Sequence, residues 1–206
     1  MGRDGVPDAA AVAARFRERY EPLLWEPGSV DELEYPALVR ELLADVGLDV
    51  DDEELARFLE AEHDAWAPAR QLGAHTHALL ESLRARGLRL AIVSNAFDPG
   101  WLLRRDLEQL GLAERVDHAV FSSEVGKRKP DAAIFRGALD ALGVDAGRAL
   151  FVGDRLREDV EGAAAVGMRT VQALWFRADE GDAEPDFRAF TPHDVLNAVR
   201  RLNGES

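Results

Sequence analysis

The sequence contains no cysteine, and this absence excludes disulfide bonds, thiol nucleophiles and metal sites with cysteine ligands. It also has no apolar run near the roughly 20 residues that a membrane-spanning helix needs. The apolar run at residues 9–14 is too short for a signal peptide and follows acids rather than a basic segment. We therefore expect a cytoplasmic protein with no membrane partner.

Positive charge is scarce in this chain. It has 25 Lys and Arg residues against 39 Asp and Glu residues, which gives a formal net charge of −14. Such a surface repels nucleic acid and anionic membranes, so neither is an expected partner. Apolar residues make up 47% of the 206 positions, which is enough for one sizeable core or for a core with a small second domain.

The first 72 residues show no strand pattern. Residues 1–8 hold two Gly, one Pro and three charged residues, and we interpret them as a remnant or a disordered N-terminus. Apolar residues then recur at helical spacing, with Asp8 as a candidate N-cap and Gly47 as the end of a second helix. Residues 9–72 are therefore expected to be all-helical.

From residue 73 onwards, helices alternate with short apolar strands. Gly87, Gly143 and Gly167 each end a helix before a strand, and the expected strands are residues 88–93, 119–121, 149–152 and 169–173. This alternation is typical of βαβ units. We therefore expect residues 73–206 to form an α/β unit around a parallel, Rossmann-like sheet.

Two carboxylates follow the expected strand 149–152. Gly153 allows a sharp turn, Asp154 lies at the strand end, and Asp159 lies where a helix is expected to begin. Oxygen ligands in such a position suit Mg²⁺. The alternative is that Asp159, with neighbouring acids, only complements the N-terminus of the helix.

Groups suited to an anion follow two other strands. Ser94 and Asn95 come directly after strand 88–93 and offer a hydroxyl and an amide to phosphate oxygens, although a simple turn is an equal alternative. Lys129 precedes Pro130, where we expect a helix to begin. A lysine there opposes the helix dipole unless an anion offsets it, and this favours an anion site. For Lys127 and Arg128 a solvated basic run is the default interpretation.

Taken in order, Ser94-Asn95, Lys129-Pro130 and Gly153-Asp154 with Asp159 resemble the motifs of the haloacid dehalogenase (HAD) superfamily of hydrolases. Residues 123–135 are similar to the third motif of that family, and residues 152–171 to the fourth. The resemblance extends over about residues 75–200. The helical residues 9–72 resemble the cap that covers the active site in one branch of the family.

The resemblance implies a Rossmann-like core, Mg²⁺ and hydrolysis of a phosphate ester, with a small phosphorylated molecule as the substrate. It assigns phosphate contacts to Ser94 and Asn95, and it assigns catalytic charge stabilisation and phosphate binding to Lys129. It assigns metal binding to Asp154, and it makes Asp159 either a second metal ligand or a residue that contacts a ligand. Because true dehalogenases of the family do not need the metal-binding Asp, Asp154 favours a phosphatase.

The chain departs from the family pattern at its start. Family members open with an apolar strand that ends in Asp-x-Asp, and the first Asp is the nucleophile. Asp4-Gly5-Val6 is similar to the tail of that motif, but the nucleophile would then fall at Gly2. We therefore expect both the strand and the attacking carboxylate to be missing, which leaves two strands in the middle of the sheet with unpaired edges.

Three hypotheses follow from this departure. The first is a phosphatase whose N-terminal strand has been lost through a misplaced start or a cloned fragment, so that the chain as given is inactive. The second is a non-catalytic HAD-like protein that binds an anion or a partner. The third is a chain that works only in an oligomer or with a partner that supplies the strand.

Overall fold

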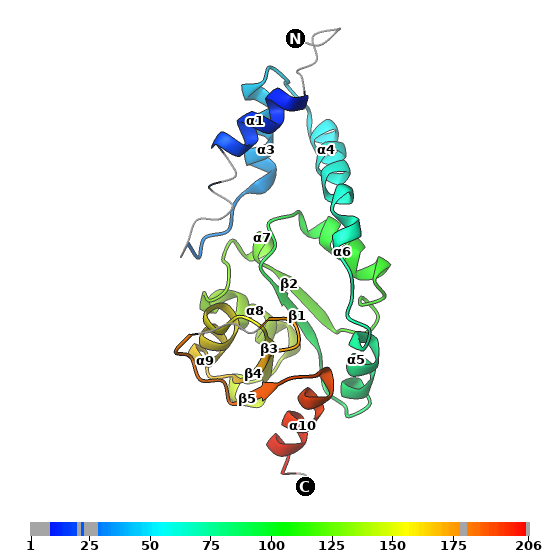
Figure 1. Ribbon diagram of the computed structural model, residues 1–206, viewed down its shortest axis with the longest axis vertical. Helices are drawn as coiled ribbons and strands as arrows, with labels where there is room; N and C mark the ends of the chain where they lie inside the picture. The colour runs from blue at the N-terminus through cyan, green and yellow to red at the C-terminus, as the bar shows by residue number, and fades with distance from the viewer. Residues whose placement is uncertain (1–8, 20–21, 23–28, 178–180, 205–206) are drawn as a thin grey trace.

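A computed structural model describes residues 9–19, 22, 29–177 and 181–204 of the chain. Among these residues, no helix is long and apolar enough to cross a lipid bilayer. The expectations for residues 1–8, including Gly2, Asp4 and the cap at Asp8, lie outside the described residues. The chain forms an elongated molecule with a helical part at one end and strands in the other (Figure 1).

The helical part, here called the helical segment, is the described portion of residues 9–72. A capping box between Asp51 and Glu54 starts its longest helix, because each of these two side chains accepts a hydrogen bond from the backbone N–H of the other residue. Tyr35, Val39 and Leu59 are buried between its helices. Its helices are α1 (Ala9–Arg19), α3 (Tyr35–Asp45), α4 (Asp52–Ala65) and the 3₁₀ turn η1 (Ala67–Ala69).

The strands form two parallel sheets. In the first, β1 (Ala91–Ser94) pairs with β2 (His118–Phe121). The second has the order β3–β4–β5, and its strands are β3 (Leu150–Gly153), β4 (Arg169–Ala173) and β5 (Phe187–Ala189). The expected α/β class and parallel pairing are confirmed.

Helices cover both faces of the strands (Figure 1). The loop after β1 leads into α6, and a left-handed glycine, Gly143, ends α8. The capping box of Thr191 and Asp194 starts the last helix. These helices are α5 (Thr76–Arg84), α6 (Gly100–Gln109), α7 (Ser122–Val125), α8 (Ala132–Leu142), the 3₁₀ turn η2 (Ala146–Arg148), the π-helical turn η3 (Leu156–Glu161), α9 (Gly162–Ala165) and α10 (Pro192–Leu202).

The two sheets lie in one layer. On one face, side chains from β1 and from Phe151 of β3 pack on the same cluster, which is built on α8 and includes Ile134 and Phe135. On the other face, Leu90 and Leu150 pack on a cluster made by α5 and α10. The strands β1 and β3 are therefore packed between the same helices, with α8 on one face and with α5 and α10 on the other.

Two local expectations are wrong, and one strand was not predicted. The helix after Lys129 begins at Ala132 rather than at Pro130, because the Asp131 side chain accepts a hydrogen bond from the Ala133 N–H and caps it. Asp159 lies within the π-helical turn η3 rather than at a helix start. The strand β5 was missed, since its three residues are too few to show a period.

Candidate functional site

The candidate site lies where β1 and β3 end. Ser94 closes β1 and Asn95 follows it, while Asp154 follows β3. Lys129 comes from the loop between α7 and α8, and it reaches toward both strands. Ligands of parallel α/β sheets bind at the carboxyl ends of strands, so this edge is the expected place for chemistry.

Lys129 is the centre of this arrangement. Its Nζ donates hydrogen bonds to the Val93 carbonyl oxygen at 3.2 Å and to Asp159 Oδ1 at 2.7 Å, and it lies 5.5 Å from the centre of the Phe151 ring. Its backbone is held by Asn95, whose Oδ1 accepts from the Lys129 N–H at 2.7 Å and whose Nδ2 donates to the Lys129 carbonyl oxygen at 3.2 Å. The structure thus brings Asn95, Lys129 and Asp159 together.

Asp159 is only 3% exposed, and both its oxygens are engaged. Oδ1 accepts from Lys129, and Oδ2 accepts from the Arg155 N–H at 3.0 Å. Gly153 makes room for this carboxylate, because a Cβ at position 153 would lie 2.3 Å from Asp159 Cγ. The buried ion pair therefore fixes the lysine head group near the strand ends, and Gly153 is required for space.

Asp154 is the carboxylate that remains available. It is partly buried, and its side chain has no hydrogen-bond or ion-pair partner among the described residues. The described residues hold no cluster of three or more His, Cys, Asp or Glu side chains fit for a metal ion. Mg²⁺ is commonly held by one or two carboxylates with waters and substrate phosphates, so Asp154 fits as one such ligand.

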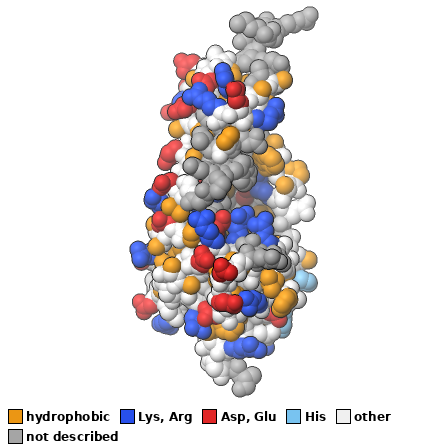
Figure 2. All heavy atoms as spheres, turned by 60° about the vertical axis from the view of Figure 1, so that its left-hand side comes forward, with side chains coloured by type: hydrophobic (Ala, Val, Ile, Leu, Met, Phe, Trp, Pro, Cys, Tyr) orange, Lys and Arg blue, Asp and Glu red, His pale blue; other side chains and the backbone are white. Residues whose placement is uncertain are grey.

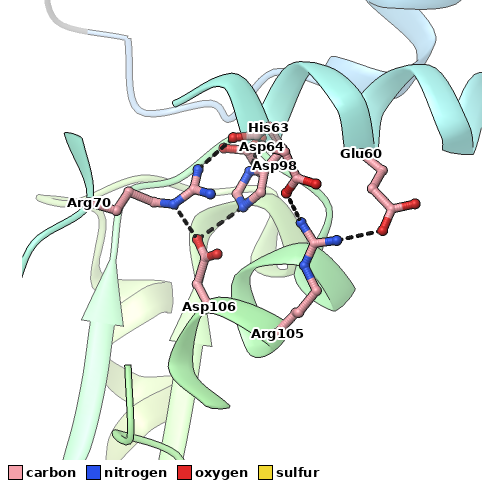
Figure 3. Close-up of polar contacts among 7 residues, drawn as sticks. All are labelled: Glu60, His63, Asp64, Arg70, Asp98, Arg105 and Asp106. Carbon is pink, nitrogen blue, oxygen red and sulfur yellow. Dashed lines mark hydrogen bonds and ion pairs between the residues drawn. The ribbon is translucent and has the colours of Figure 1, made fainter. Parts of the chain in front are cut away.

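A second polar cluster joins the helical segment to the strand-bearing part (Figure 3). His63 on α4 is 2% exposed, and its Nδ1 and Nε2 lie 3.0 Å from Asp98 Oδ1 and from Asp106 Oδ2, respectively. Arg70 Nε lies 3.0 Å from the same Asp106 oxygen. Each nitrogen of the buried ring therefore lies within hydrogen-bond distance of a carboxylate oxygen.

This cluster did not emerge from the sequence. Its one signal is that His63 continues the four-residue spacing of the buried Leu55 and Leu59 on α4. Arg105 on α6 adds ion pairs with Glu60 and Asp64, two acidic residues of α4 (Figure 3). The result is a charged seam between α4 and α6.

A further contact links the helical segment to the same loop. The Ser122 hydroxyl is fully buried, donates to Glu32 and accepts from the Ala96 N–H at 2.8 Å. Glu32 precedes α3, and its side chain is also within 3.7 Å of Arg128. The loop after β1 is therefore in contact with the helical segment through Glu32 on one side and through His63 on the other.

Burial shifts two titratable groups near this loop. Burial is the largest cause that raises the pKa of the Glu62 carboxyl above its usual value, and the neighbouring Asp98 adds to it. Burial also raises the pKa of the Tyr35 hydroxyl, which is helped by the charge of Glu62. The Tyr35 ring lies 4.7 Å from the Phe97 ring, so Phe97 in the loop after β1 packs into the helical segment.

Comparisons with known proteins agree with this geometry. A family profile described as haloacid dehalogenase-like hydrolase matches residues 4–167. A phosphoserine phosphatase from Thermus thermophilus is 40% identical over 199 residues, which cover 94% of this chain and 69% of that protein. A phosphoglycolate phosphatase from Rhodospirillum rubrum is 42% identical over 121 residues, which cover 57% of this chain and 47% of the other.

A solved structure gives the same result. The crystal structure of a HAD phosphatase from Thermococcus onnurineus superposes with a TM-score of 0.64 and 26% identity, and it covers 95% of this chain and 80% of that one. The resemblance drawn from the three motifs is therefore confirmed. The chain belongs to the haloacid dehalogenase-like hydrolase family.

Proposed function

We propose that this protein is a Mg²⁺-dependent, cytoplasmic phosphatase that acts on a small phosphorylated metabolite. The observation that carries the proposal is the position of Lys129, which is fixed between the ends of β1 and β3 by Asn95 and Asp159. The printed activities of the relatives support it, since two of those compared are phosphatases of small phosphorylated molecules.

Each residue of the site has a proposed role. Ser94 and Asn95 bind phosphate oxygens, and Lys129 stabilises the negative charge that grows on the phosphoryl group. Asp154 holds Mg²⁺, which supplies charge neutralisation when bound. Asp159 remains a predicted metal ligand, and its pairing with Lys129 supports a positioning role as well.

Surface charge supports an anionic substrate. The chain as a whole is acidic, with a net charge of −14. Figure 2 nevertheless shows Lys and Arg side chains gathered at mid-height on one face, between the helical segment and the strand-bearing part. A local basic patch on an acidic protein favours small anions over polyanions such as nucleic acid. We propose that the helical segment acts as a cap over this site.

The nucleophilic carboxylate of the family is the remaining part of the site. No carboxylate of the described residues lies at the tip of a strand between β1 and β3. We therefore propose that residues 1–206 bind phosphate with Mg²⁺ but turn over p-nitrophenyl phosphate slowly or not at all. Losing the nucleophile of a well-studied protease costs about 10⁶ in kcat, which sets the expected scale.

The test measures binding and turnover separately. Phosphate binding is followed by ³¹P NMR with and without Mg²⁺, and turnover by release of p-nitrophenol. We expect Mg²⁺-dependent binding that Asp154→Asn abolishes and that Asp140→Asn, at an exposed acid on α8, leaves unchanged. Absence of phosphate binding would refute the proposed site. Turnover that Asp154→Asn abolishes would show instead that an attacking group is present.

A further inference from the structure

The loop that carries Lys129 is paired with the helical segment. The Arg128 N–H donates a hydrogen bond to the Val30 carbonyl oxygen at 2.8 Å. Asp31 lies opposite Lys127 in an antiparallel bridge, which we call the loop bridge. The backbone directly before Lys129 is therefore fixed by a stretch of the helical segment that is almost 100 residues away in the sequence.

The loop bridge directs two adjacent cationic side chains to opposite sides. Across an antiparallel pair, directly opposite residues project to one side and their neighbours project to the other. Lys127 and Asp31 form an ion pair on the outer side, where their side chains are 41% and 75% exposed. Arg128 and Glu32 lie on the inner side, where their side chains are 26% and 2% exposed. Lys127 therefore faces the solvent, whereas Arg128 faces inward.

The inner side of the loop bridge lies against the loop after β1. The Glu32 carboxylate accepts a hydrogen bond from the buried Ser122 hydroxyl, which itself accepts from the Ala96 N–H at 2.8 Å. Ala96 directly follows Asn95, one of the proposed phosphate ligands. Arg128 Nη1 lies 3.7 Å from Glu32 Oε1. The Arg128 guanidinium is therefore held beside the loop that is proposed to bind phosphate.

The Arg128 guanidinium donates no hydrogen bond among the described residues. Its 3.7 Å contact with Glu32 is longer than a hydrogen bond. The two Glu32 oxygens accept instead from the Ser122 hydroxyl and from the Leu33 N–H at 3.0 Å. A guanidinium has five donors in a rigid fork, so one edge can stay beside Glu32 while another edge binds a second carboxylate.

We propose that Arg128 is a specificity-determining residue that binds a carboxylate of the substrate while the strand ends hold the phosphate of the same molecule. The substrate class is then a phosphorylated carboxylic acid. The inference rests on the proposed function, because it adds a second contact to the substrate of that site. Lys127, although it is the neighbouring cation, has no part in this contact, since it points outward to Asp31.

The surroundings of Arg128 favour a carboxylate over other second groups. The planar fork of an arginine matches the two coplanar oxygens of a carboxylate. A second phosphate carries more negative charge, so the nearby Glu32 repels it more strongly than it repels a carboxylate. An ammonium group on the substrate would be repelled by Arg128 itself. A group with a single negative charge is therefore the best match.

The experiment compares three phosphate esters of similar length. Propyl phosphate has no second polar group, 2-carboxyethyl phosphate has a carboxylate, and 2-aminoethyl phosphate has an ammonium. Their affinities for the full chain are measured with Mg²⁺ by ³¹P NMR titration, and kcat/KM replaces the affinity for any ester that is hydrolysed. We expect the carboxylate ester to bind at least about tenfold more tightly than propyl phosphate, since a hydrogen bond between charged groups supplies that factor. The ammonium ester should bind no more tightly than propyl phosphate.

Two variants of Arg128 and one matched control assign the preference to a residue. Arg128→Gln should weaken binding of 2-carboxyethyl phosphate at least about tenfold and binding of propyl phosphate less than about threefold. Arg128→Lys keeps the charge but loses the fork, so it should retain only part of the preference for the carboxylate. Lys127→Gln removes the outward cation of the same loop bridge and should retain the whole preference.

The outcomes separate this inference from the proposed function. Binding of propyl phosphate without a preference for the carboxylate ester overturns the role of Arg128 and leaves the phosphate site standing. An equal loss for both esters in Arg128→Gln also overturns that role, because it would show that Arg128 only supports the structure. A preference that Arg128→Gln does not reduce assigns the carboxylate to another residue and overturns it too. If none of the esters binds, the proposed phosphate site is refuted, and this inference with it.

Discussion

The buried ion pair of Lys129 and Asp159 offers the sharpest test of the site geometry. The two side chains are 12% and 4% exposed, and their charged atoms are 2.7 Å apart. Asp159→Ala leaves the lysine ammonium mostly buried, with the Val93 carbonyl oxygen as its one hydrogen-bond partner among the described residues. Breaking a buried pair in this way costs about 3–5 kcal/mol of unfolding free energy.

The magnitude is large enough to measure by two methods. For a chain of this size, the loss corresponds to a fall in Tm of about 6–20 °C. Urea denaturation gives the free energy directly if the m-value is unchanged. The matched control is Glu184→Ala, which removes an exposed partner of Arg188 and should change the unfolding free energy by at most about 1 kcal/mol.

A double-mutant cycle separates the pair from its surroundings. Asp159→Asn retains an acceptor for the Arg155 N–H, so it should cost less than Asp159→Ala. Combining it with Lys129→Met removes both charges, and the double variant should be more stable than the sum of the single losses predicts. If Asp159→Ala loses less than about 1 kcal/mol, or if the two changes simply add, the ion pair does not hold the lysine as described.

Three further substitutions test other parts of the structure. Gly153→Ala places a Cβ against a buried carboxylate and should lower the unfolding free energy by about 1–3 kcal/mol in urea denaturation, whereas Gly147→Ala, with nothing within 4 Å, should not; equal effects would contradict the close contact. His63→Leu leaves two acids without their shared donor and should lower Tm by several degrees, in contrast to the exposed His75→Ala, and an unchanged Tm would refute the buried cluster. Burial raises the pKa of the Glu62 carboxyl, so the stability that its neutral form contributes at low pH is lost as the pH rises from the ordinary value of 4.5 through the raised value. Over that range Glu62→Gln should therefore gain stability relative to the native chain. Parallel pH profiles of Tm for the two proteins would contradict this.

The sequence predicted the α/β layout well, because helix ends carry strong local signals. The capping box at Asp51 and the left-handed Gly143 mark helix ends that no tertiary contact needs to decide. β4 runs over the expected residues 169–173, since its apolar run is bounded by Gly167 and the strand is buried on both faces. The expected loss of a strand between β1 and β3 stays a prediction, because residues 1–8 lie outside the described residues.

The site was predicted in part. The structure brings Lys129 and Asn95 together at the strand ends, as the motif order predicts. The expectation that Lys129 lies directly before a helix was wrong, because Asp131 rather than Pro130 caps the start of that helix. Spacing along the chain says nothing about the pairing of Lys129 with Asp159, which are 30 residues apart. The contacts of His63 were missed for the same reason, since its acids come from a different helix and a loop.

The loop after β1 has a consequence for how the protein would respond to a bound molecule. Residues 95–98 carry Asn95 at one end and Asp98 at the other, and the helical segment reaches this loop through Glu32, by way of Ser122, and through His63. A shift of the helices over the strands must therefore either move this short stretch as well or break the contact between the buried His63 and Asp98. Under the proposed function, movement of the helical segment and phosphate binding at Asn95 are coupled through residues 95–98, so a substrate that keeps the helical segment away from the strands should also bind more weakly through its phosphate.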